Sequence, residues 1–303
     1  MEPFVLEKPD FKKIDQRKVI DAFLKNQSGY SDFINKVSEN NYYYWDHIKY
    51  LPTPQNFNPL EFWFIVKLVR NLSSKNTPIK SEKGKYFTWD RLNYTDEFLH
   101  KIDLNMGGEI FSHYQNIITP YGKQRLLSKS IIEEAIASSQ LEGAVITTPK
   151  AKKLIVENKT PKDKSERMII NNYKTMQAIT DNYKNLPLSI EMLLEMHKLI
   201  TKDALDFSQQ NRFRKDTDDI TVNDQLKFIY HIPPKEAFLK EQLPRLINYA
   251  NDENDSGFIH PIIKAIFLHF WIGYLHPFYD GNGRIARTLF YWYLIKKGYW
   301  AIQ

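Results

Sequence analysis

The sequence predicts a mainly α-helical protein that carries one β-hairpin. Apolar residues recur at helical spacing over most of the chain, and N-capping residues followed by proline mark several helix starts. Only residues 220–230 show two short β-rich runs around a polar turn. The 303 residues are 42% hydrophobic and 14% aromatic, so the chain can bury a sizeable core. We therefore expect a folded protein and not a disordered one.

Composition excludes several classes of site. The chain has no cysteine, which rules out disulfides, a thiolate nucleophile and thiolate metal ligation. The N-terminus lacks the apolar run of a signal peptide. The longest apolar stretch, Ala265 to Leu275, has only eleven residues and is too short to span a bilayer. We expect a soluble, cytoplasmic protein with no membrane partner.

The net charge of +6 and the pI of about 9.0 raise the question of a nucleic-acid partner. The lysines are scattered along the chain and form no dense basic block. A solvated basic surface on a helical protein explains this charge, so we do not expect nucleic acid as a partner. A small polyanionic ligand needs only a few of these charges.

Residues 1–120 are predicted to form a mostly helical N-terminal region. Asn58 as N-cap and Pro59 in the first turn predict a helix with apolar spacing as far as Leu72. The polar stretch Ser73 to Lys85, with Gly84, predicts a loop. The next helix is expected from about Asp96 to Gly107, with Phe98, Ile102 and Met106 on its apolar face.

Two aromatic runs of this region have two interpretations. Tyr42 to Trp45 and Phe62 to Phe64 either form a partner surface or belong to the core. We expect the core, because large aromatic side chains are more often buried than exposed.

Residues 121–303 are predicted to form a helical core. Ser128 or Ser130 can cap a helix over about 128–143. Ser189 is a predicted N-cap and Pro261 a predicted first-turn residue. Further helices are expected at about 165–184, 189–202, 235–252, 259–275 and 284–297. The segment 220–230 is predicted as the β-hairpin, with an irregular loop as the alternative.

The segment HPFYDGNGRIAR, residues 276–287, lies at a junction between two predicted helices. Gly281 to Gly283 place unhindered N–H groups at a helix N-terminus, where the helix dipole favours an anion. Arg284 and Arg287 are three residues apart and are expected on one side of the first turn. Two guanidinium groups above such a cradle suit a polyphosphate.

The same segment supplies two further chemical groups. His276 has a side chain whose ordinary pKa suits a general base, and Asp280 offers a carboxylate that can hold Mg²⁺. His-Pro or DGNG alone is usually an ordinary turn, but this order and spacing rarely arise by chance. His260, His269 and His276 have no carboxylate cluster beside them, so a histidine metal site is not expected.

HPFYDGNGRIAR is similar to the signature of the Fic family and matches it at every defined position. Residues from Arg212 to Pro234 look like the flap of that family, and the resemblance covers about 120–300. It implies a Fic-type helical bundle with a β-hairpin flap at about 212–232. It also implies a protein adenylyltransferase, which moves AMP from ATP onto a Ser, Thr or Tyr hydroxyl of a target protein, the chain itself being one candidate.

The resemblance also implies a role for each motif residue. His276 would deprotonate the hydroxyl, Asp280 would carry Mg²⁺, and Phe278 would anchor the loop. The ATP phosphates would bind along Gly281, Asn282, Gly283, Arg284, Ile285, Ala286 and Arg287, with the two arginines at the β/γ end. The flap would clamp the target backbone by strand addition.

A second segment, SSQLEG at 138–143, resembles the inhibitory signature of the family. Ser138 and Glu142 are four residues apart and share a helix face. The resemblance implies that Glu142 pairs with Arg287 and displaces the γ-phosphate. It thus implies the class of the family that carries an N-terminal inhibitory helix. It therefore implies low basal activity.

The sequence departs from the family in two places. The flap of the family opens with a glycine before its arginine, whereas Asn211-Arg212-Phe213-Arg214 stands here, so the register of the flap stays open. The sequence ends at Gln303, where relatives continue with adenine contacts and often a winged-helix domain. The chain is therefore either truncated or an unusually short member.

Other functions remain open beside AMP transfer. AMP removal or transfer of another phosphate-containing group uses the same motif, and a homodimer is one assembly that we consider. A nucleotide-sensing regulatory protein, with the N-terminal region as its partner surface, is the alternative of another class. The intact His276 favours an enzyme, because binding alone requires no base.

Overall fold

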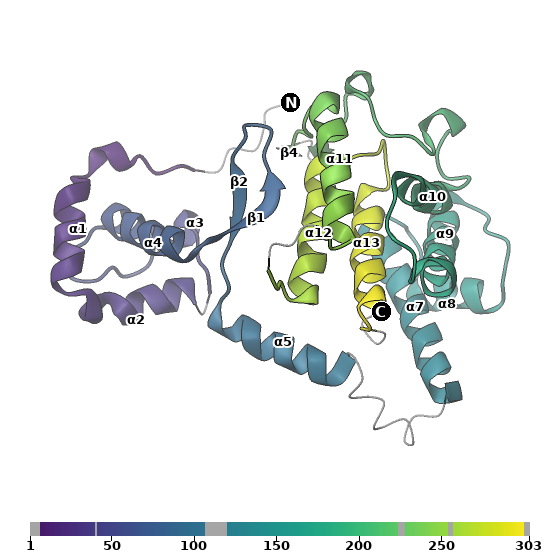
Figure 1. Cartoon of the computed structure of the whole chain (residues 1–303), viewed down its shortest axis with the longest axis horizontal. Helices are drawn as coiled ribbons and strands as arrows, with labels where there is room; N and C mark the ends of the chain where they lie inside the picture. Colours follow the sequence, from purple (N-terminus) through teal and green to yellow (C-terminus); the bar gives the residue numbers. More distant parts are fainter. Residues whose placement is uncertain (1–6, 40, 107–119, 224–227, 254–256, 300–303) are drawn as a thin grey trace. The chain divides into compact units, whose positions relative to one another are not determined.

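The structure is a computed structural model that describes residues 7–39, 41–106, 120–223, 228–253 and 257–299. The chain divides into two compact units, residues 2–100 and residues 101–303, and each is considered by itself (Figure 1). Both are built mainly from helices, as the sequence predicts. None of the described helices is long and apolar enough to cross a membrane.

The N-terminal unit is a helical cluster with a small sheet. Its elements are a short 3₁₀ turn (Phe11–Lys13), α1 (Gln16–Lys25), α2 (Gln27–Ser38), α3 (Trp45–Ile48), α4 (Pro59–Ser73), β1 (Lys75–Lys80), β2 (Tyr86–Trp89) and the start of α5 (Asn93–Met106). Asn58 caps α4 as predicted, and Glu61 completes a capping box. α4 is central because Phe62, Trp63 and other apolar residues on it pack against α1 and α2.

The prediction of a loop from Ser73 to Lys85 is wrong. β1 and β2 form an antiparallel hairpin there, pairing Lys75 with Trp89 and Lys80 with Tyr86. Only Thr77 and Ile79 of β1 are buried. The alternation of buried and exposed residues that indicates a strand was therefore too short to detect among polar residues. Gly84 closes the turn with a φ of +78°, a conformation that favours glycine.

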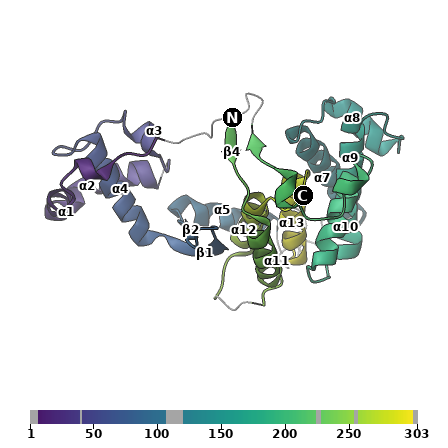
Figure 2. The same cartoon turned by 90° about the horizontal axis from the view of Figure 1, so that it is seen from above.

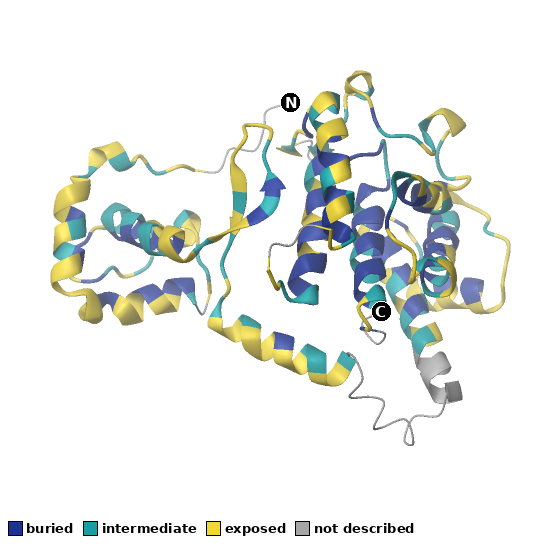
Figure 3. Cartoon of the chain, in the orientation of Figure 1, coloured by how far each residue is buried: buried dark blue, intermediate teal, exposed yellow. Residues whose placement is uncertain are grey.

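The C-terminal unit is a helical bundle. Its elements are α7 (Pro120–Leu141), α8 (Thr148–Val156), α9 (Lys164–Ala178) with a π-helical extension (Ile179–Tyr183), α10 (Ile190–Thr201), 3₁₀ turns at Phe207–Gln209 and Asp216–Asp218, β3 (Val222–Asn223), β4 (Ile229–His231), α11 (Glu236–Ala250), α12 (Pro261–Leu275) and α13 (Asn282–Lys296). α12 and α13 lie side by side in both views and are dark blue over much of their length (Figures 1, 2 and 3). Their contact buries Leu268, Trp271, Leu289 and Trp292.

Most helix predictions for this unit are confirmed, but one predicted start is wrong and one helix was not predicted. Ser189 caps α10, and Pro261 stands in the first turn of α12. The helix predicted for about 128–143 begins at Pro120, because neither Ser128 nor Ser130 interrupts the helical backbone. The segment 148–156, for which no element was predicted, forms α8, with Pro149 in its first turn.

The hairpin prediction is confirmed, since β3 and β4 pair antiparallel, although its turn at 224–227 lies outside the described residues. The apolar face predicted for α5 is confirmed only in part, because Ile102 and Met106 are half-buried. Phe98 is 59% exposed, and Leu99 is the buried residue. Gly107, the predicted end of α5, also lies outside the described residues.

Candidate active site

The segment 276–281 forms a tight loop between α12 and α13. His276 ends α12 in the left-handed region, with φ +46° and ψ +59°, while its N–H donates to the Ile272 carbonyl at 2.8 Å. The Asn282 side chain accepts from the Phe278 N–H at 2.8 Å and donates to the Phe278 carbonyl at 2.9 Å. Phe278 is fully buried, so it anchors the loop in the core.

The N-terminus of α13 forms an anion cradle within this loop. Gly281 adopts a φ of +84° and its carbonyl accepts from Ile285 N–H, which starts the helix. The N–H groups of the next three residues, Asn282 to Arg284, come before the first helical N–H donor, Ile285, and have no partner within the described part of the chain. Such groups, together with the helix dipole, favour an anion. The side chain of Asn282 is engaged with Phe278, so this residue can offer only its backbone.

His276 lies half-buried at the entrance to this loop. Burial, together with the charges of His231 and Arg214, lowers the pKa of its imidazole to about 4, against a hydrogen bond to the Gly273 carbonyl. The imidazole is therefore neutral at pH 7 and able to accept a proton. Its pKa nevertheless lies below the ordinary value on which the sequence prediction of a well-matched base relied.

Arg214 holds the backbone around His276. Its Nε donates to the His276 carbonyl at 2.7 Å, and its Nη2 donates to the carbonyls of Leu275 at 3.1 Å and Pro234 at 2.6 Å. The Arg214 N–H also donates to the Pro277 carbonyl at 2.9 Å. The guanidinium is 4% exposed, so it fixes the end of α12 against the start of α11. Sequence reasoning did not assign this role to Arg214.

His197 of α10 packs against the loop. It is fully buried and stacks on the Phe278 ring with centroids 3.9 Å apart and planes 4° apart. Its Nε2 lies 3.0 Å from the Asp280 carbonyl, which can only accept, so this nitrogen carries the proton. Burial lowers the pKa of His197 to about 4.

Arg284 is more deeply buried than Arg287. Arg284 is 2% exposed and its Nη1 donates to the Ile200 carbonyl at 3.1 Å. Its Nη2 lies 3.8 Å from Asp280 Oδ1. The prediction that both guanidinium groups project from one side of the turn stays a prediction, but Arg284 is buried and engaged within the protein. The interior between α10 and α13 accommodates Arg284 because a backbone carbonyl and a carboxylate satisfy its charge.

Ile285 and Ala286, the two motif residues between the arginines, are also buried. Their side chains pack in the core, so any contact of this pair with a ligand involves their backbone. Of the predicted phosphate-binding side chains, Arg287 remains the one that is partly exposed.

Arg287 contacts the end of α7. Its Nε donates to Ser138 Oγ at 2.6 Å, and its Nη2 donates to Glu142 Oε1 at 2.7 Å. The Glu142 carboxylate also lies against Gly283, where a β-carbon would clash with Oε1. The structure thus brings together Ser138, Glu142 and Arg287, which lie far apart in the sequence. Glu142 fills space beside the anion cradle.

Asp280 directly precedes Gly281 in the loop. Its Oδ1 accepts from Gly281 N–H at 2.5 Å. It borders a cavity of 640 Å³ that is lined by Lys164, Asp203, Ala204, Leu205, Asp206, Gln209, Tyr279 and Asp280. No group of three or more histidine, cysteine or acidic side chains gathers to hold a metal ion in the described ranges.

The flap starts with an asparagine in a glycine-like conformation. Asn211 has a φ of +53°, which asparagine tolerates better than most residues. Arg212 forms a two-point ion pair with Asp218 at 2.8 and 2.9 Å, and this pair lowers the pKa of Asp218 to about 2. On β4, His231 Nε2 lies 2.7 Å from the Tyr274 carbonyl and fastens the hairpin to α12. The flap is therefore attached at both ends to the loop that holds His276.

Comparison with known proteins agrees with this geometry. Residues 187–294 match the model of the Fic/DOC family, a range that includes the flap and the loop but not Glu142. A protein adenylyltransferase Fic from Drosophila persimilis is 29% identical over 116 residues, 38% of this chain and 21% of that protein. The same-named protein from Nematostella vectensis is 26% identical over 184 residues, 58% of this chain and 40% of its own length. The chain thus spans less than half the length of these relatives.

Solved structures share the fold. Fic-1 from C. elegans superposes with a TM-score of 0.57 at 17% identity, covering 93% of this chain and 73% of that chain. A Fic domain containing signaling protein from Bacteroides thetaiotaomicron superposes with a TM-score of 0.54 at 22% identity, covering 67% of this chain and 72% of that chain. The prediction of a mainly helical fold of this type is confirmed.

Proposed function

Because residues 187–294 of this chain form a Fic/DOC domain, we propose that the chain transfers AMP from ATP to a protein hydroxyl and that Glu142 restrains this transfer. Relatives named protein adenylyltransferase support the reaction. The observation that carries the proposal is the anion cradle at the N-terminus of α13, which lies in one loop with a neutral His276. Phosphoryl-type transfer depends mainly on such positioning and charge neutralisation.

In the proposed reaction, the ATP phosphates bind the N–H groups of Asn282, Gly283 and Arg284. His276 accepts the proton of the target hydroxyl as its oxygen attacks the α-phosphorus of ATP. The bond between the α-phosphorus and the bridging oxygen breaks, and pyrophosphate leaves. The low pKa of His276 keeps the imidazole unprotonated and ready to accept that proton.

Asp280 is proposed to hold Mg²⁺. A lone carboxylate beside a phosphate site suits this ion, because Mg²⁺ commonly takes one or two carboxylates, waters and substrate phosphate oxygens. When bound, Mg²⁺ would neutralise phosphate charge. The Asp280 carboxylate is half-buried and borders the 640 Å³ cavity, so a metal ion has room beside it.

Glu142 is proposed to act as a brake through charge and space. Its carboxylate lies 2.7 Å from Arg287 Nη2 and against Gly283, so it neutralises the guanidinium and crowds the cradle. A γ-phosphate at Arg287 would meet this negative charge. ATP is then held in an unproductive pose, and the resting protein has low activity. Ser138 assists by keeping the guanidinium in place through the 2.6 Å bond from Nε.

The target is proposed to be a Ser, Thr or Tyr side chain of another protein or of this chain, and the reaction is proposed to occur in the cytoplasm. The β3–β4 hairpin offers the strand that aligns the target backbone. Phe228, Tyr230 and Ile232 on or beside β4 are 47–64% exposed and supply apolar contacts.

The position of the radioactive label in ATP tests the reaction. The Glu142→Gly protein is incubated with a cell lysate and with ATP carrying ³²P at either the α or the γ position. AMP transfer labels proteins from the α position alone, whereas phosphorylation labels them from the γ position. The proposal fails if α-labelled ATP gives no protein label, or if His276→Ala in the same background labels equally well.

A further inference from the structure

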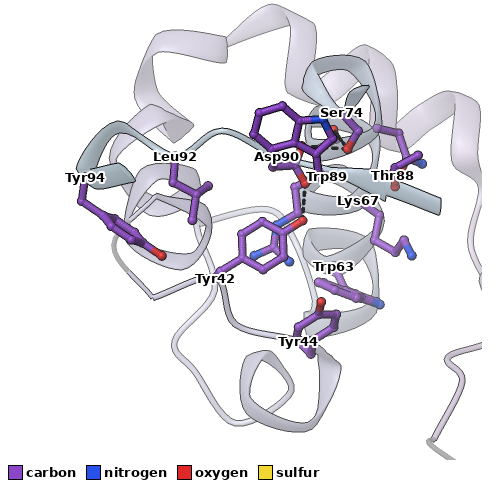
Figure 4. Close-up of a pocket in the computed structure, with 12 residues that line it drawn as sticks. Tyr42, Tyr44, Trp63, Lys67, Ser74, Thr88, Trp89, Asp90, Leu92 and Tyr94 are labelled. Carbon is purple, nitrogen blue, oxygen red and sulfur yellow. Dashed lines mark hydrogen bonds between the residues drawn. The ribbon is translucent and has the colours of Figure 1, made fainter. Parts of the chain in front are cut away.

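The N-terminal unit contains a cavity of 450 Å³ that the proposed transfer reaction does not use (Figure 4). It lies between α4, β2 and the segment before α3. The residues that line it are Tyr42, Tyr44, Trp63, Lys67, Arg70, Asn71, Ser74, Thr88, Trp89, Asp90, Leu92 and Tyr94. All of them belong to one compact unit, and the volume is that of a small-molecule site.

Arg70 at this cavity is a buried cation without a carboxylate partner. It is 7% exposed, and its donors contact neutral groups, with Nε 3.2 Å from Ser38 Oγ and Nη2 2.7 Å from the Val37 carbonyl. Its guanidinium carbon lies 4.0 Å from the centroid of the Tyr42 ring. No acidic side chain lies within ion-pair distance among the described residues of the unit. Buried charges in proteins are normally paired, whereas the Asp90 carboxylate acts on Arg70 only from beyond ion-pair distance. Arg70 can therefore take a closer anionic partner.

Asp90, the acidic residue that lines the cavity, is engaged elsewhere. Its carboxylate accepts hydrogen bonds from the Tyr42 hydroxyl and from Ser74 Oγ, the latter at 2.7 Å (Figure 4). Since these donors fix its position, Asp90 is a preorganised acceptor for an N–H group of a ligand. Lys67, one turn before Arg70 on α4, is exposed and has no ion pair within the described residues. It adds a second positive charge to the same cavity.

Aromatic rings line the cavity where it opens. Tyr44 is 62% exposed and Tyr94 is 43% exposed, which is unusual for rings that surround a hollow. In Figure 4, Tyr44 and Trp63 lie on one side of the cavity and Tyr94 on the other. Exposed aromatic faces beside cationic side chains bind nucleobases by stacking.

We infer that this cavity binds a nucleotide, with its base against the aromatic rings and its phosphate at Lys67 and Arg70. Asp90 and Asn71 then contact the polar edge of the base. The chemistry is the same for a free mononucleotide and for one nucleotide of a single strand. The inference is independent of the proposed AMP transfer, because every residue involved lies in the N-terminal unit.

Photo-crosslinking with 8-azido-AMP on the full chain tests this site. Peptide mass spectrometry separates label on residues 42–94 from label on the loop at 276–287. In the wild-type protein we expect saturable label within 42–94. Lys67→Glu should weaken it by about tenfold or more, the usual effect of losing a charge-assisted contact. Lys36→Glu is the matched control, because Lys36 is also exposed in this unit but does not line the cavity.

Competition identifies the source of the nucleotide. If unlabelled AMP protects residues 42–94 from labelling, the ligand is a free mononucleotide. If a short single-stranded oligonucleotide protects them at much lower concentration, the ligand is a nucleic-acid strand. The inference is overturned if no saturable label appears within 42–94 or if neither competitor protects. It is also overturned if Lys67→Glu and Lys36→Glu label equally there.

Discussion

Glu142 Oε1 lies 2.7 Å from Arg287 Nη2, and the same carboxylate fills the space that a side chain on Gly283 would need. Glu142 follows α7, whereas Gly283 and Arg287 stand in the first two turns of α13. One carboxylate thus contacts both a guanidinium and a helix N-terminus, the two groups best suited to a phosphate. The five predictions below follow from this contact and from the groups that hold the loop.

Gly283→Ala should raise AMP transfer in the otherwise unchanged protein. A methyl group at this position collides with Glu142 Oε1 and forces the carboxylate away from Arg287. Alanine suits the first turn of a helix, so α13 should remain intact. The measurement is protein labelling from α-labelled ATP. In the Glu142→Gly background the same substitution should bring no further increase. A fall of labelling in both backgrounds would mean that Gly283 is needed for ATP binding and that the substitution does not act through Glu142.

Arg214→Gln should reduce transfer and raise the pKa of His276. The substitution removes a buried cation whose charge lowers that pKa and whose donors hold the Leu275 and His276 carbonyls. NMR titration of the histidine ring reports the pKa separately from the rate. Arg212→Gln is the matched control, since Arg212 pairs with Asp218 and contacts none of these carbonyls. An unchanged His276 pKa in Arg214→Gln contradicts the assignment.

The protein should lose stability as the pH falls from about 6.5 to about 4. In the folded state burial keeps His197 and His276 neutral down to a pKa of about 4, whereas unfolded histidine takes up a proton near 6.5. Protons therefore favour the unfolded chain within this window, and the two groups contribute no pH dependence above it. His197→Phe should reduce the slope of unfolding free energy against pH by roughly one proton. Urea unfolding at pH 5 and pH 7 measures this, with the exposed His47→Phe as control.

Asp280→Asn should lower transfer at limiting Mg²⁺ and raise the Mg²⁺ concentration that gives half the maximal rate. Asparagine keeps the side-chain oxygen that accepts from the Gly281 N–H, so the loop should keep its shape. Asp206→Asn removes a carboxylate from the same cavity and is the matched control. If both variants respond to Mg²⁺ as the wild type does, Asp280 does not hold the ion.

The sequence predicted local features better than side-chain directions. Ser189, Pro261 and the flap hairpin follow from cap and pattern rules that depend on neighbouring residues only. The burial of Arg284 could not be predicted, because its spacing to Arg287 fixes a helix face but not whether an acceptor such as the Ile200 carbonyl lies in the core. No helix rule could have revealed that partner.

Two further residues lacked a sequence signal for their position. Arg214 belongs to the flap segment, but its contacts to α12 span more than sixty residues and depend on tertiary packing. Tyr44 was expected in the core with its aromatic neighbours, yet it is 62% exposed at the N-terminal cavity. Composition predicts burial for aromatic residues on average and cannot identify the ring that lines a cavity.

The central claim is that Glu142 restrains an AMP transferase, and parallel labelling of three proteins with α-labelled ATP tests it most directly. We expect Glu142→Gly to label at least about tenfold more strongly than the wild type, since it removes a charge-assisted contact from Arg287. The labelling of Glu142→Gln should lie between those two, because glutamine keeps the shape of the side chain and loses its negative charge. Equal labelling of Glu142→Gly and the wild-type protein would contradict the account.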